Sequence, residues 1–259
     1  MKIPDDGISF QHRLHIRETP PAQPLVMYQR WRNLLFLHWE VEPDQIQQTL
    51  PSGLRVDTFE GKAYVGIVPF FMEGIRPRFL PAVPGISNFL ELNLRTYVIG
   101  PDGTPGVWFY SLDANSWIGV EVAKSFFSLP YEHAYQQSPF FQGKEWIDFH
   151  STRKNPQEAI PLRYTYRPVK EIGEAPLGTL EFFLVERYIL FSYRPKSQKL
   201  FKGRIHHTPY VLQEAEVHTY QPELFALNGF ETPQRSPDHV VMSKGVSVNV
   251  HWIEEVKRA

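Results

Sequence analysis

The chain has 259 residues and a nearly balanced charge, with 27 lysines and arginines against 28 aspartates and glutamates and a formal net charge of -1. This length fits one large β domain without requiring a second core. No block of like charge occurs, which argues against nucleic acid or an anionic membrane as the main partner. Cysteine is absent, so disulfides, thiolate zinc sites and cysteine nucleophiles are excluded.

The N-terminal residues do not resemble an export signal, because residues 1–6 carry two aspartates and a proline where an apolar stretch is needed. The longest apolar runs, over 34–37 and 182–185, are far shorter than the roughly 20 residues of a membrane-spanning helix. These features predict a cytoplasmic protein. Residues 1–25 end in a proline-rich stretch and are predicted to form an extended arm, followed by a single domain over 26–259.

The predicted elements are mostly short strands, since aromatic residues make up 14% of the chain and the 23 prolines supply many rigid turns. In chain order they are a strand over 33–39, a short helix starting at Pro43, a hairpin of 54–58 with 62–71, a hairpin of 88–99 with 106–112, a helix over about 117–127, a short helix after Thr179, and strands over 189–194, 200–206, 210–217 and 246–253. The predicted fold class is therefore mainly β with a few short helices.

The strand over 89–98 carries the most informative pattern, because successive side chains of a strand point to opposite faces. One face is apolar and is expected to pack against a core. The other face presents Phe89, Glu91, Asn93, Arg95 and Tyr97, spaced about 6.6 Å apart. A polar row of this kind fits a pocket where polar groups converge on a ligand. The alternative is the solvated face of a half-exposed antiparallel sheet.

The second strand of this hairpin favours the pocket. Val107 and Phe109 on one face and Trp108 and Tyr110 on the other leave both faces apolar until Ser111, which is typical of a strand buried on both sides. A charged row beside such a strand is also partly enclosed and needs partners. Ser111 itself is expected to point into the pocket.

Several further residues are candidates for the site, and each of them also has an alternative structural interpretation. His38 either contacts the ligand or is a buried core residue. His206 and His207 are adjacent and point to opposite faces of a strand, so no metal site is predicted, although His207 is a candidate for the pocket. Tyr131 either donates to a substrate oxygen or only packs. Motifs for phosphates, dinucleotides, nucleophile elbows or zinc helices are missing from the sequence, and no cofactor is predicted.

The sequence contains several stretches that are specific only in combination: His38-Trp39, Leu50 to Leu54, Gly66 to Phe70, Phe89 to Val98, Gly106 to Ala114, Leu129-Pro130-Tyr131, Glu186-Arg187-Tyr188 and His206-His207. Through these stretches the chain resembles, over nearly its whole length, the YqjF-like family of uncharacterised bacterial proteins, within the acetoacetate decarboxylase-like superfamily. This resemblance implies a partly open, cone-like antiparallel β-barrel with a few covering helices and an internal cavity.

The same resemblance implies a departure from the superfamily's chemistry. Acetoacetate decarboxylase forms a Schiff base through a lysine in a Phe-Pro-Lys-Lys run, and such a lysine needs a lowered pKa. Here the matching positions hold Tyr131 and Glu132. The superfamily's pocket glutamate resembles Glu91, and its N-terminal pocket arginine resembles Arg32 or Arg30. Decarboxylation through an imine is therefore not expected.

Two functions fit these observations. The first is an enzyme with lyase-like or hydrolase-like activity on a small carboxylate or carbonyl compound, in which Glu91 acts as acid or base, Arg95 or Arg32 binds a carboxylate, and Tyr131 with Ser111 orients a carbonyl. Asn93, Tyr97, His38 and His207 would complete the binding pocket. The second is a non-catalytic protein that binds or senses a metabolite. A purely structural role and a homo-oligomer are both compatible with the sequence.

Overall fold

A computed structural model describes residues 8–83, 85–116, 128–141 and 145–256. The strands are β1 (Leu25–Val41), β2 (Arg55–Val56), β3 (Ala63–Pro77), β4 (Phe89–Ile99), β5 (Pro105–Ala114), β6 (Tyr131–Gln137), β7 (Phe140–Phe141), β8 (Trp146–Arg153), β9 (Leu162–Gly173), β10 (Ile189–Arg194), β11 (Lys199–His206), β12 (Leu212–Thr219), β13 (His239–His251) and β14 (Glu254–Glu255). The helices are α1 (Phe10–Glu18), α2 (Pro43–Gln47) and α4 (Leu180–Val185), with short 3-10 turns at Pro156–Glu158, Pro222–Leu224 and Ala226–Asn228. The mainly β class is confirmed.

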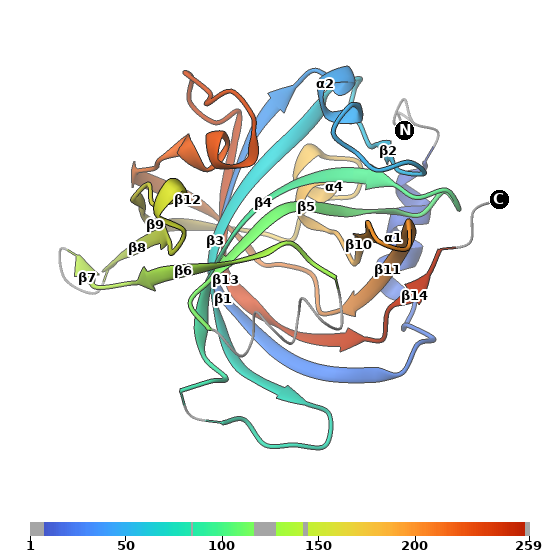
Figure 1. Cartoon of the computed structure of the whole chain (residues 1–259), viewed down its shortest axis with the longest axis horizontal. Helices are drawn as coiled ribbons and strands as arrows, with labels where there is room; N and C mark the ends of the chain where they lie inside the picture. The colour runs from blue at the N-terminus through green and yellow to red at the C-terminus, as the bar shows by residue number, and fades with distance from the viewer. Residues whose placement is uncertain (1–7, 84, 117–127, 142–144, 257–259) are drawn as a thin grey trace.

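Strand pairing closes the sheet into two rings that share β13, β1, β3, β4 and β5. The first ring is completed by β10 and β11, and the second by β6, β8, β9 and β12, which lie on opposite sides of the shared strands in Figure 1. Most neighbours are antiparallel, but β5 pairs in parallel with both β10 and β6. The arrangement agrees with the partly open cone expected from the resemblance.

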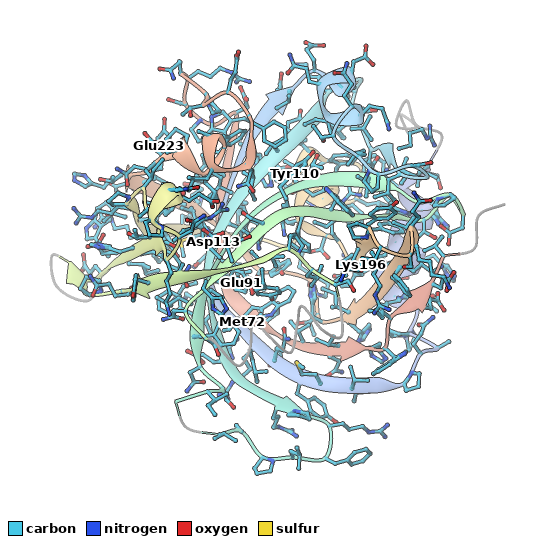
Figure 2. The ribbon with its side chains drawn as sticks, viewed as in Figure 1. Met72, Glu91, Tyr110, Asp113, Lys196 and Glu223 are labelled. Atoms are coloured by element: carbon cyan, nitrogen blue, oxygen red, sulfur yellow. The ribbon has the colours of Figure 1, made fainter. Side chains whose placement is uncertain are left out.

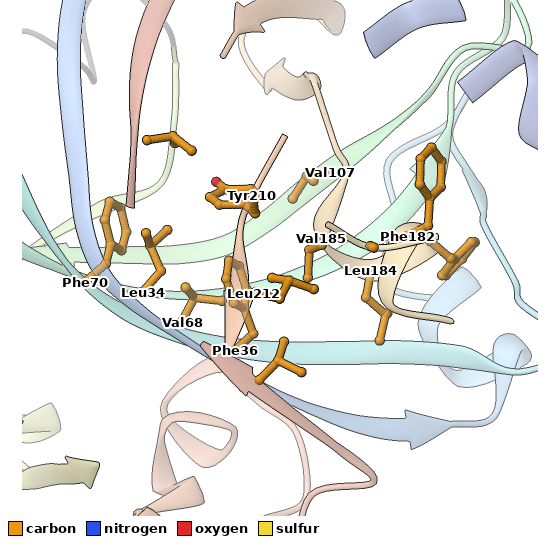
Figure 3. Packing of buried hydrophobic residues seen from close by; sticks show 14 of the residues in the cluster. Leu34, Phe36, Val68, Phe70, Val107, Phe182, Leu184, Val185, Tyr210 and Leu212 are labelled. Atoms are coloured by element: carbon orange, nitrogen blue, oxygen red, sulfur yellow. The ribbon is translucent and has the colours of Figure 1, made fainter. Parts of the chain in front are cut away.

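The shared strands are buried on both faces because each face looks into a different ring. Along β1, Leu34 and Phe36 join one apolar cluster, whereas Leu35 and Leu37 join the other. Figure 3 shows the first cluster, in which side chains from β1, β3, β5 and α4 surround a common interior. Because strand side chains alternate between the two faces, successive residues of a shared strand contribute to two different apolar cores.

The N-terminal segment differs from its prediction. Residues 10–18 form helix α1, so the extended arm expected over 1–25 is wrong there. The Ser9 hydroxyl caps the helix by accepting a hydrogen bond from the amide of His12, and Phe10, Arg13 and Ile16 are buried on one face. A buried arginine in the middle of that face hid the apolar periodicity.

Other predicted elements are confirmed with small changes. β4 and β5 form the expected hairpin, and Thr179 caps α4 through a hydrogen bond from the amide of Phe182. The turn at Glu60-Gly61 is present, with positive φ at both residues, but β2 pairs with β4 instead of β3. The predicted helix over 117–127 lies outside the described residues.

Candidate functional site

The first ring encloses a cavity of about 490 Å³ with a largely apolar wall. Leu34, Val68, Phe70, Val107, Val185 and Tyr210, all labelled in Figure 3, belong to this wall. The segment between β3 and β4, which extends below the body of the molecule in Figure 1, contributes Leu80 and Val83. Because these two residues line the cavity and are also 59% and 48% exposed, they mark a place where it reaches the surface.

Glu91 projects from β4 into this cavity and is only 2% exposed. The Tyr131 hydroxyl donates a hydrogen bond of 2.8 Å to its Oε2 atom, and no salt bridge joins Glu91 to a cation among the described residues. Burial raises the pKa of Glu91 to about 7, against the opposing effect of hydrogen bonds from Tyr131 and Asn93. The carboxyl group is therefore poised to gain or lose a proton near neutral pH.

The sheet topology brings Tyr131 to this position. β5 lies between β4 and β6, and its parallel pairing with β6 places Leu112 opposite Tyr131. Burial, together with the carboxyl of Glu91, raises the pKa of Tyr131 well above its usual value, so the phenol keeps its proton. Figure 2 shows Glu91 in the interior beside Met72. Glu91 lies near the start of β4, just after the segment that joins β3 to β4.

Two arginines lie farther along the cavity. The Arg95 guanidinium is 5.3 Å from the ring centroid of Phe36 and 5.7 Å from that of Tyr97, and the Arg187 guanidinium is 4.8 Å from the Tyr97 ring. Nε and Nη2 of Arg95 and Nη2 of Arg187 are buried without a hydrogen-bond partner among the described residues. A buried N–H group without a hydrogen-bond acceptor costs free energy, so these donors favour a ligand that brings an acceptor into the cavity.

Arg187 is held in place from behind by Asp57. Its Nη1 atom donates to Asp57 Oδ2 at 2.5 Å, and Nε donates to the carbonyl oxygen of Phe183. Arg13 of α1 forms a bidentate pair with the same carboxylate at 2.7 and 2.8 Å. Burial lowers the pKa of Arg187 to about 10, which still leaves it charged at neutral pH. Asp57 and the carbonyl oxygen of Phe183 thus hold the Arg187 guanidinium at the cavity wall, and Arg13 in turn holds Asp57.

Four of the predicted site residues meet in the cavity: Glu91, Asn93, Arg95 and Tyr131. Ser111 does not join them. A bulge in β5 shifts the register between the Leu94–Ser111 and Arg95–Phe109 pairs, so Val107, Phe109 and Leu112 point into the cavity. Ser111 faces the second ring, where its hydroxyl accepts a hydrogen bond from Asn228.

Arg32, in contrast, is not among the residues that line the cavity. Its guanidinium donates to the carbonyl oxygens of Trp31 and Val246 and lies 4.0 Å from Glu73. The second cavity arginine is Arg187, which the sequence pattern did not single out as a site residue. The available signal was its position two residues after the apolar run over 182–185, where a charged side chain that is buried needs a partner.

The remaining candidates form a buried layer behind the cavity and do not line it. Nδ1 of His38 lies 3.0 Å from Nδ1 of His239, and its Nε2 lies 2.6 Å from the Tyr97 hydroxyl. Burial lowers the pKa of His38. His207 stacks on Tyr188 and also contacts Tyr210, and burial lowers its pKa to about 4. Two of these side chains contact residues of the wall, because Tyr97 lies beside Arg95 and Arg187, and His207 lies beside Tyr210.

Within the described residues, no group of three or more histidines, aspartates and glutamates is arranged to hold a metal ion. Across the same parts of the chain, every helix is too short or too polar to cross a membrane.

The fold is shared with solved enzyme structures of low sequence identity. The enduracididine biosynthesis enzyme MppR, complexed with pyruvate, matches with a TM-score of 0.62 at 12% identity over 93% of each chain. An acetoacetate decarboxylase-like enzyme from Sphingomonas wittichii RW1 matches with a TM-score of 0.60 at 13% identity, over 90% of this chain and 94% of that one. Acetoacetate decarboxylase from Legionella pneumophila matches with a TM-score of 0.57 at 13% identity, over 94% and 95%.

Sequence comparison gives a narrower assignment. The chain is 38% identical to the uncharacterized protein YqjF of Bacillus subtilis over 213 residues, which cover 82% of this chain and 85% of that protein. The family of uncharacterised conserved proteins designated DUF2071 matches residues 28–247, a range that contains β4, β5 and the cavity residues described above. The chain belongs to this family, and it has the acetoacetate decarboxylase-like fold.

Proposed function

We propose that the cavity binds a small organic acid or carbonyl compound and that the protein acts on it as an enzyme without a Schiff-base lysine. The observation that carries this proposal is the pairing of Glu91 with Tyr131 in an apolar cavity that also holds unsatisfied arginine donors. A carboxyl group with a pKa of about 7 matches the requirement for a general acid or base at neutral pH. The complex of MppR with pyruvate supports a small oxo acid as a ligand for this fold.

Each polar residue has a distinct role in this proposal. Arg95 and Arg187 bind the carboxylate through charge-assisted hydrogen bonds. Glu91 transfers a proton to or from the reacting carbon or oxygen, and Tyr131 donates a hydrogen bond that fixes the carboxyl group. Asn93, whose Oδ1 atom is buried without a partner among the described residues, contacts the ligand between these groups.

The described lining of the cavity contains no lysine, which argues for chemistry other than imine formation. Tyr131 occupies the position where the resemblance places the superfamily's lysine. Lys124 lies outside the described residues, so a chemical test is needed. Borohydride treatment in the presence of an oxo acid, followed by mass spectrometry, should leave every lysine unmodified. A covalent mass increase on a lysine would overturn this part of the proposal.

The alternative function is binding without turnover, and one observation favours it. Glu91 already accepts a hydrogen bond from Tyr131, so the pair is satisfied without a substrate. The cavity would then sequester or sense a metabolite.

A ligand screen followed by product analysis separates the two functions. We expect short oxo acids, hydroxy acids or acyl compounds to raise the melting temperature, because a ligand at 100 times its Kd stabilises a protein by about 2.7 kcal/mol. Each hit is then incubated with the wild type and with Glu91→Gln, and products are followed by NMR. Turnover that Glu91→Gln abolishes while binding persists supports the enzyme. Binding without product favours the alternative, and the lack of any hit contradicts both.

A further inference from the structure

We infer that the ligand is an elongated acid whose reacting group lies several bonds away from its carboxylate, in contrast to a short 2-oxo acid such as pyruvate. This inference rests on the proposed function and adds a substrate class to it. It follows from where the acid–base pair and the arginines lie along the cavity.

The cavity has two groups of polar side chains, or stations, and the spacing along β4 keeps them apart. Glu91 and Arg95 point to the same face and are four residues apart, which corresponds to about 13 Å along an extended strand. β4 pairs with β3 in an unbroken register from Phe89 to Thr96, so no bulge shortens this distance. The acid–base station is Glu91 with Tyr131, and the cationic station is Arg95 with Arg187.

The side chains keep the two stations apart. Both guanidinium groups lie by the Tyr97 ring, at 5.7 and 4.8 Å from its centroid, and Tyr97 follows Arg95 on the side away from Glu91. No salt bridge joins Glu91 to either arginine, although all three residues are described and line one cavity. A carboxylate bound by the arginines is therefore remote from the proton carried by Glu91.

The wall and the volume fit a longer ligand. Val68, Val107 and Phe109 belong to the wall that the two stations share, and they offer only apolar contact. The cavity volume of about 490 Å³ falls within the range of roughly 300 to 1,000 Å³ that is usual for ligand pockets. A ligand that touches both stations needs roughly six or more bonds between its carboxylate and its reacting carbon, given the strand spacing less the reach of the side chains. Pyruvate would satisfy one station and leave most of the cavity unfilled.

The test is a series of oxo acids of increasing length with the full-length wild type: pyruvate, 4-oxopentanoate, 7-oxooctanoate and 9-oxodecanoate. Each buried methylene is worth about 0.8 kcal/mol, so titration calorimetry should show affinity rising about fourfold per methylene until both stations are bridged. We expect 7-oxooctanoate to bind at least about 100-fold more tightly than pyruvate. NMR should also show faster exchange of the protons beside its carbonyl for solvent deuterium than in 4-oxopentanoate, because Glu91 takes up the proton and returns a deuteron.

Matched controls separate the length inference from the proposed function. The methyl ester of 7-oxooctanoate keeps the tail and removes the charge, and it should bind much more weakly to the wild type. Arg95→Gln should weaken binding of the acid and leave the ester unchanged, whereas Arg32→Gln, outside the cavity, should change neither. The ester comparison needs no variant, so it remains valid if Arg95→Gln folds poorly.

The outcomes point to different failures. Equal affinity for pyruvate and 7-oxooctanoate, with both dependent on the carboxylate, would overturn the length inference and leave acid binding intact. Equal affinity for 7-oxooctanoate and its ester would overturn the role given to the arginines. If no member of the series binds, this inference fails, and the proposed function fails with it only if the hydroxy acids and acyl compounds of the ligand screen do not bind either.

Discussion

The β4–β5 hairpin buries two carboxylates, Glu91 and Asp113, and their surroundings differ. Asp113 faces the second ring, where Arg153 donates to both of its oxygens at 2.9 and 3.1 Å. Glu91 faces the cavity, and its hydrogen-bond partners among the described residues are the Tyr131 hydroxyl and the Asn93 amide. Burial raises the pKa of both carboxyl groups, but the Arg153 guanidinium opposes the rise at Asp113, whereas Glu91, without a cation among the described residues, has a pKa of about 7. The same contrast predicts which substitutions damage folding and which alter only the site.

The largest effect is expected from Leu92→Asp, on the face of β4 opposite to Glu91. Leu92 is fully buried in the apolar cluster of the second ring, and an aspartate there would bring an unpaired charge into that cluster. We expect a loss of about 4 kcal/mol or more in the free energy of unfolding, measured by urea denaturation. The volume-conserving Leu92→Met is the control and should cost less than about 1.5 kcal/mol. A folded, stable Leu92→Asp protein would contradict the assignment of the two faces.

Asp113→Asn is expected to cause the second largest loss in the free energy of unfolding. It leaves the guanidinium of Arg153, which is 4% exposed, without its bidentate carboxylate. Removing one partner of a buried pair costs about 3 to 5 kcal/mol in the free energy of unfolding, again measured in urea. Because Arg153 also donates to Glu158, the lower end of this range is expected. A cost below about 1 kcal/mol would show that the pair is not structural.

Glu91→Gln should change the pH dependence of stability instead of abolishing folding. The folded pKa of about 7 exceeds the ordinary value of 4.5, so the unfolded chain releases this proton first and wild-type stability falls as the pH rises from about 4.5 through 7. The fall amounts to about 3 kcal/mol, at 1.36 kcal/mol for each pKa unit. Glu91→Gln should lack this slope when urea denaturation is repeated across that pH range. Parallel pH profiles for both proteins would show that Glu91 does not titrate near neutrality.

The smallest effect is expected from Arg32→Gln. Its side chain is 34% exposed, donates to two backbone carbonyl oxygens and lies 4.0 Å from Glu73. Exposed pairs of this kind contribute at most about 1 kcal/mol, so the thermal midpoint should change little. The increase in melting temperature that a ligand causes should equal that of the wild type. A selective loss of ligand binding would place Arg32 in the site after all.

The alternation of side chains in β4 could be predicted because period two is a local property of the sequence. It identified Glu91, Asn93 and Arg95 as one face before any partner was known. Ser111 was misplaced because the bulge in β5 changes the parity after Phe109, and no residue type in that stretch marks it. Arg187 was missed because its partner Asp57 lies 130 residues away. Helix α1 was missed for the same reason, since Arg13 is buried only through a carboxylate 44 residues farther along the chain.

The link from α1 to the cavity bears on how the protein should be prepared. Arg13 is the bidentate partner of Asp57, and Asp57 in turn anchors Arg187 at the cavity wall. A truncated version starting after residue 20, chosen because the leading segment reads as a dispensable tail, would delete one positive charge from this triad and loosen the anchor. Ligand screens on such a shortened protein would report on an altered binding surface, so purification tags belong at the other terminus.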